Sequence, residues 1–287
     1  TKSDGQIQLI INLPNALAPL STFVRHNVIV DDTHCFSYKA FVTGFASNLS
    51  YVLSSVSLEM RQDYGHQILA VMLAYNRMIF NYATFLYDKS KSKIQLVRDI
   101  ADKLPTVPTS SYFLCDSWYT SIDVIESFIK KGFYTIGALR TNRILYSKGI
   151  RSKTSEIAQT IKPSDTSLVT VGGREFYIWR YEGKLNGITN AVVLLSYPKN
   201  AFGQKQALRM FISTNVDLST QDILDIYVSR WPIEVFFRSR KSKLRLDTYQ
   251  IRSQKGIDRY WIIMSLTITY AAFAKAGTVP LKKAVWC

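Results

Sequence analysis

Residues 227–241 read YVSRWPIEVFFRSRK, and four polar residues of this stretch recur at intervals of three, four and seven. They are Tyr227, Arg230, Glu234 and Lys241. On one α-helix, with about 100° of rotation per residue, these intervals bring all four side chains to within about 60° of one another. We therefore predict a single helix that begins after Ser219, is kinked at Pro232 and carries an acid among bases along one stripe.

Positive charge is in excess both around this stripe and over the whole chain. The nearby bases are Arg238, Arg240, Lys243 and Arg245. The chain contains 36 Lys and Arg against 21 Asp and Glu, a formal net charge of +15. Such an excess favours a polyanionic partner, nucleic acid, with an anionic membrane surface as the alternative. The apolar stretches 67–87 and 261–276 are interrupted or short, so we expect buried strands and a buried helix there rather than membrane spans.

The cysteine and histidine content excludes two further classes of protein. Three cysteines, at positions 35, 115 and 287, form no CxxC motif, and only three histidines are present. This argues against a disulfide framework or a structural zinc site and favours a reducing, intracellular setting. The 287 residues, 47% of them hydrophobic, predict one large domain or one domain with an insertion. Because the chain begins with Thr, we expect residues upstream to be missing.

Two short apolar runs are each followed by an acid. Residues 26–30 predict a buried strand that ends in Asp31-Asp32-Thr33, and residues 111–115 predict another that ends at Asp116. Carboxylates at equivalent ends of neighbouring strands could share a divalent cation. The alternatives are a turn or helix cap for the first pair and a helix N-cap for Asp116.

The other patterns predict a mixed α/β protein. A hairpin is expected over 67–75 and 78–87, helices over 94–104, from about 117 to 131 and over 256–276, and a strand over 132–139. Residues 140–215 alternate in short segments separated by glycines, which indicates a β-rich insertion. Trp179 lies in this insertion, near several basic residues in the sequence. Its indole could stack on a nucleic-acid base or belong to the core of a small sheet.

This order of elements, together with the motif Tyr-x2-Arg-x3-Glu-x6-Lys, resembles the DDE transposases of the bacterial IS4 group. The resemblance extends from about residue 28 to 270. It implies an RNase H-like mixed sheet flanked by helices, formed by residues 1–139 and 216–287 and interrupted by the insertion 140–215. Family members usually carry a helical end-binding domain before the first Asp, whereas few residues precede it here, so a fragment or a decayed copy is an open alternative.

The resemblance also implies roles for individual residues. The family's Asp-x-Thr pattern selects Asp31 over Asp32, so Asp31, Asp116 and Glu234 are expected to be catalytic and to hold two Mg²⁺ or Mn²⁺ ions. The basic residues and the tyrosine of the signature are expected to bind DNA phosphates. One aromatic residue is expected to stack on an extruded DNA base. These DNA-binding residues are Tyr227, Arg230, Lys241 and Trp179.

The implied activity is metal-dependent cleavage and strand transfer at insertion-sequence ends. Its partners would be double-stranded DNA, as transposon ends and as target, and a second copy of the chain in a DNA-bound homodimer. No membrane and no small-molecule cofactor are expected, and the implied location is the bacterial cytoplasm, with the nucleoid. The alternatives are an RNase H-like nuclease without strand transfer and an inactive DNA-binding remnant of a transposase.

Overall fold

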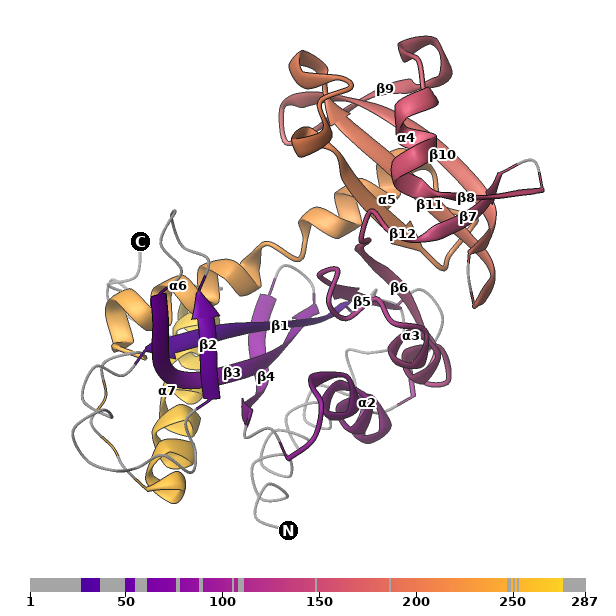
Figure 1. Cartoon of the computed structure of the whole chain (residues 1–287). Coiled ribbons are helices and arrows are strands. Elements are labelled where there is room, and N and C mark those ends of the chain that lie inside the picture. The colour runs from indigo at the N-terminus through magenta and orange to yellow at the C-terminus, as the bar shows by residue number, and fades with distance from the viewer. Residues whose placement is uncertain are drawn as a thin grey trace. The chain divides into compact units, whose positions relative to one another are not determined.

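The computed structural model describes residues 27–36, 50–54 and, except for a few short gaps, 61–275. The chain forms two compact units. The first contains the residues up to Lys93 and those from Trp231 onward, and the second contains Ile94–Arg230. Figure 1 shows the elements of each. The predicted boundaries of the insertion, at 140 and 215, stay predictions.

The first unit is an antiparallel sheet with two helices. Strand β3 (Arg61–Tyr75) pairs with β1 (Asn27–Phe36), β2 (Ser50–Ser54) and β4 (Met78–Tyr87). Helix α6 (Pro232–Leu244) packs against β1, and α7 (Gln254–Lys275) against β4. The predicted hairpin and last helix are confirmed. The first strand continues five residues beyond Asp31, because β3 is long enough to pair with it as far as Phe36.

A fully buried arginine joins the two helices of this unit to its sheet. Helix α6 turns Ile233, Phe236, Phe237 and Arg240 inward, a spacing of one helix face. The Arg240 guanidinium donates to Thr84 Oγ1 (3.2 Å) and Asn81 Oδ1 (3.5 Å) on β4. It also donates to Ser265 Oγ and to the carbonyl of Trp261 (3.4 Å) on α7. This group therefore fixes α6 against both neighbouring elements.

A β-bulge presents two of these acceptors on one face. In β4, Asn81 pairs with Met72 and Ala83 with Val71, so Tyr82 is the extra residue. Without it, residues 81 and 84 would point to opposite faces of the sheet. The Asn81 amide donates to the carbonyls of Val71 (3.1 Å) and Ala83 (2.9 Å). The Asn81 side chain therefore donates hydrogen bonds to two backbone carbonyls at the bulge and also accepts one from Arg240.

The second unit is a mixed sheet with helices. Strands β5 (Ser111–Cys115) and β6 (Phe133–Ala138) are parallel and are joined through α3 (Ile122–Ile129). The sheet continues antiparallel through β12 (Arg209–Ser213), β11 (Ile188–Pro198), β10 (Arg174–Leu185), β7 (Ile144–Ser147) and β8 (Ile150–Lys153), and β9 (Ser167–Val171) pairs with β10. The helices are α2 (Lys93–Lys103), α4 (Thr154–Thr160) and α5 (Thr220–Val228), and three 3-10 turns lie at 163–165, 199–201 and 205–207.

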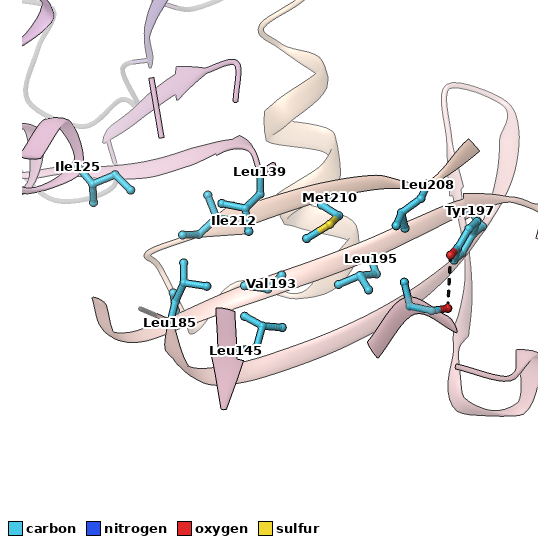
Figure 2. Close-up of a cluster of buried hydrophobic side chains, with 12 residues drawn as sticks. Ile125, Leu139, Leu145, Leu185, Val193, Leu195, Tyr197, Leu208, Met210 and Ile212 are labelled. Atoms are coloured by element: carbon cyan, nitrogen blue, oxygen red, sulfur yellow. Dashed lines mark hydrogen bonds between the residues drawn. The ribbon is translucent and has the colours of Figure 1, made fainter. Parts of the chain in front are cut away.

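The β-rich part of this unit has a core of its own, shown in Figure 2. Buried side chains from β7, β10, β11 and β12 meet Ile125 of α3 and Leu139 after β6, and the Tyr197 hydroxyl donates to the carbonyl of Ala158 on α4 (3.5 Å). The mixed α/β class and the β-rich run after β6 are confirmed, and they are compatible with an RNase H-like fold. The hairpin β7–β8 and helix α4 were not predicted.

The predicted single helix over the signature is wrong. Helix α5 ends at Val228 and α6 begins at Pro232, with Ser229 and Arg230 closing the end of α5 through hydrogen bonds to Ile226 and Tyr227. The physical reason is Pro232, which has no N–H to continue the ladder and suits the first position of a new helix. Tyr227 and Glu234 therefore lie on different helices.

Arg240→Ala is expected to destabilise the protein by about 3 kcal/mol or more, because it removes the guanidinium that donates to the buried hydroxyl oxygens of Thr84 and Ser265. Arg238→Ala is the control. Arg238 is exposed on the same helix and should change stability by no more than about 0.5 kcal/mol. Urea unfolding of both variants without DNA measures the difference, and equal losses would contradict the assigned role of Arg240.

Candidate functional site

The two neighbouring acids of β1 lie on opposite faces of the first unit's sheet. Successive side chains of a strand alternate, and residues paired across strands share a face. Asp31 pairs with Ala70, which pairs with Thr84. Since Thr84 accepts from Arg240 of α6, this row faces the helices. Asp31 is therefore on the helix-covered face, and Asp32 is on the other.

Asp32 already takes part in a local ion pair. Its Oδ2 accepts from Lys93 Nζ at 2.9 Å and from Gln67 Nε2, and both charged side chains are mostly buried. Asp31 instead accepts from the backbone N–H of Asp32 (2.9 Å) through Oδ1. Lys93 lies 61 residues further along the chain, so no local sequence pattern predicts this contact. These contacts give Asp32 a structural role within the first unit.

Glu234 stands in the first turn of α6, and Lys241 in its last turn. An acid at a helix N-terminus and a base at the C-terminus both interact favourably with the helix dipole. Glu234 is partly buried, and its backbone N–H donates to the Trp231 carbonyl at 3.0 Å. Because α6 packs against β1, Asp31 and Glu234 belong to the same side of the first unit.

In the second unit, Asp116 begins a tightly bonded loop after β5. Its Oδ1 accepts from the N–H of Trp118 (2.8 Å) and its carbonyl from the N–H of Tyr119 (3.3 Å). The N-cap residue of α3 is Ser121, so the alternative role of Asp116 as that cap is excluded. The loop packs closely on β6, where a Cβ at Gly137 would lie 2.6 Å from a Thr120 methyl.

The signature residue Tyr227 lies near this acid. The pKa of Tyr227 is raised to about 12, chiefly by burial; Arg230 lowers it, and the nearby Cys115 and Asp116 contribute to the rise. The Arg230 guanidinium lies over the Tyr227 ring, 5.7 Å from its centroid, and Phe211 packs on the same ring. Within the second unit, Tyr227 therefore lies under the Arg230 guanidinium and near enough to Asp116 for the charge of that carboxylate to act on it.

Trp179 is partly buried. It packs against the hydrophobic cluster of Figure 2 and stacks on Tyr181, with 6.2 Å between ring centroids. This is the core role that the sequence left open, and stacking on a DNA base stays a prediction. Sequence reasoning missed a second, more exposed indole, Trp118, for which the only signal was its place two residues after Asp116.

The predicted metal ligands belong to different units, Asp31 and Glu234 to the first and Asp116 to the second. Among the residues that the structure describes, no three His, Cys, Asp or Glu side chains are grouped closely enough to hold a metal ion. The chemistry of the predicted set, three carboxylates, fits a hard cation such as Mg²⁺ or Mn²⁺. Within the same described ranges, no helix combines the length and apolar character needed to cross a bilayer.

The mixed α/β fold is compatible with the RNase H-like fold of enzymes that process nucleic acids. Comparison with known families makes the assignment specific, because residues 61–270 match the family described as Transposase DDE domain. The chain belongs to this family, whose members are transposases that act on DNA and generally use divalent metal ions. The match includes Asp116 and all four signature residues but begins after Asp31. A search of curated proteins gave no significant match.

The raised pKa of Tyr227 makes a prediction about alkaline stability. An unfolded tyrosine ionises near pH 10, whereas folded Tyr227 does so near pH 12. The protein should therefore lose about 2 kcal/mol of stability from this residue as the pH rises from 10 to 12, a loss that is absent below pH 10.

Tyr227→Phe should remove this part of the pH dependence, as measured by urea unfolding at pH 9 and at pH 11.5. Tyr270→Phe, on an exposed tyrosine of α7, is the matched control and should follow the wild type. A Tyr227→Phe protein with the unaltered alkaline loss would contradict the burial of this phenol.

Proposed function

We propose that this chain is a DNA transposase of the IS4 group that cleaves and joins DNA strands at insertion-sequence ends. The observation that carries the proposal is that Tyr227 lies under the Arg230 guanidinium and near Asp116, although these two signature residues are 111 and 114 residues further along the chain than Asp116. A structural role alone does not require an acid and a guanidinium near one buried phenol. Membership of the transposase family supports the same activity.

Asp31, Asp116 and Glu234 would hold two divalent cations. When bound, such ions supply an activated water or 3′-hydroxyl and stabilise the charge that develops at phosphorus and at the leaving oxygen. Asp31 is suited to this role because it lies on the face covered by α6, the helix that carries Glu234. Asp32 is not part of the set, since Lys93 and Gln67 already bind its carboxylate.

The remaining signature residues would bind the phosphates that flank the scissile one. Arg230 can donate two parallel hydrogen bonds to a phosphate, whereas Lys241 contributes a point charge. Tyr227 keeps its proton well above neutral pH and can donate it to a phosphate oxygen. Double-stranded DNA would be both donor and target, and a DNA-bound homodimer would present two ends together.

A nuclease of the same fold that cuts without joining is the nearest alternative function, because it would use the same acids. A strand-transfer assay separates the two activities. The full chain is supplied with Mg²⁺, a pre-cleaved end with a free 3′-hydroxyl and a supercoiled target. Joined products support the transposase, whereas cutting of the end without joined products supports the nuclease.

The carboxylates can be tested by isosteric amides. Asp31→Asn, Asp116→Asn and Glu234→Gln are each expected to lower Mg²⁺-dependent nicking by several orders of magnitude, because each loses a cation ligand. Asp32→Asn is the internal control and should retain activity to within about tenfold. Nicking that survives in Asp116→Asn, or that is lost only in Asp32→Asn, would refute the assignment of the three acids.

Lys241→Ala is expected to weaken DNA binding and to reduce the slope of log K against log salt by about one unit, as loss of one phosphate contact requires. The measurement is a salt titration of binding by fluorescence anisotropy. Lys130→Ala removes an exposed lysine at the end of α3 and should leave the slope unchanged. An unchanged slope in Lys241→Ala would remove this residue from the phosphate contacts.

A further inference from the structure

A half-exposed tryptophan projects from the loop that begins with Asp116. Trp118 is 50% exposed, whereas the two residues that follow it, Tyr119 and Thr120, are buried. The guanidinium of Arg140, from the loop after β6, lies over the Trp118 ring at 4.9 Å from its centroid. The indole thus stands in solvent with a cation on one face, in the same loop as a predicted catalytic acid.

The backbone that carries this indole is firmly held. The Trp118 N–H donates to Asp116 Oδ1, so the orientation of the carboxylate and the position of the ring depend on one turn. Arg143 donates through Nη2 to the Thr120 carbonyl at 2.7 Å and ties the loop after β6 to this turn. Thr120 Oγ1 donates to the Ser117 carbonyl at 3.2 Å. Little conformational entropy remains to be lost when a ligand contacts the ring.

Single exposed apolar residues are common and need no function. Trp118 differs from such residues in three ways. Its loop is held by hydrogen bonds to Asp116 and Arg143, a guanidinium already covers part of the ring, and Asp116, whose charge acts on Tyr227, is two residues away. Aromatic faces next to cations are the elements with which proteins hold unpaired nucleotides.

We propose that Trp118 is a nucleotide-stacking residue, which holds an unpaired DNA base next to the phosphate positioned at Asp116. This inference rests on the proposed function. Arg140 keeps the indole in place and adds positive charge near the neighbouring phosphate. Trp118 is better placed for stacking than Trp179, whose indole is already partly used in the core of the insertion.

The test is a double-mutant cycle that measures the DNA affinity of protein variants for intact DNA and for DNA that lacks single bases. The full chain is titrated with a fluorescein-labelled duplex that carries a short single-stranded extension, and with the same duplex in which each extension base in turn is replaced by an abasic site. The proteins are wild type, Trp118→Ala, Trp118→Phe and Ile150→Ala, the last an exposed control on β8 that is 67% exposed. Trp118→Ala retains the backbone N–H of residue 118, so the Asp116 carboxylate keeps this hydrogen bond.

Trp118→Ala is expected to weaken binding by about tenfold, whereas Trp118→Phe and Ile150→Ala should stay within about threefold of the wild type. At one extension position, the abasic DNA should bind wild type and Trp118→Ala equally, because the stacking partner is missing from both. If Trp118→Ala binds like Ile150→Ala, or its loss persists at every abasic position, the stacking role is overturned. A wild-type chain that fails to bind any of these DNAs would instead refute the proposed function.

Discussion

Arg240 places a guanidinium group in the interior of the first unit, where it donates hydrogen bonds from α6 to side chains of β4 and α7. A buried charge is costly unless its donors are satisfied, so α6 has little freedom to slide or rotate on the sheet. Glu234 and Lys241 are carried by that same helix. The position of the predicted site residues in this unit therefore depends on a residue that does not face DNA.

The sequence predicted most strands and helices more successfully than the path of the signature. Alternation and helical spacing are local properties, and they identified β3, β4, β5 and α2. Arg240 was counted among the bases around the stripe, because composition cannot tell a solvated arginine from a buried one. Its partners Asn81 and Ser265 are distant in sequence, and a bulge at Tyr82 is needed to present one of them.

The choice between Asp31 and Asp32 shows why the face on which a strand residue lies cannot be derived from sequence alone. A strand alternates with period two, so two consecutive acids must face opposite sides, but the sequence does not say which side the helices cover. That information comes from the register of β1, β3 and β4 and from the contact of Arg240 with Thr84. Asp32 lies on the opposite face, where Lys93 and Gln67 donate hydrogen bonds to its carboxylate.

The break in the signature helix changes what its spacing means. If the four residues shared one helix, their intervals would express a common face. Because α5 ends at Val228 and α6 starts at Pro232, the position of each half of the motif is set by its own local contacts. Tyr227 packs against Phe211 and lies under the Arg230 guanidinium, whereas Glu234 is placed by the start of α6. Pro232 is therefore a helix start that sets the position of Glu234, two residues later in the first turn, and not a defect in a longer helix.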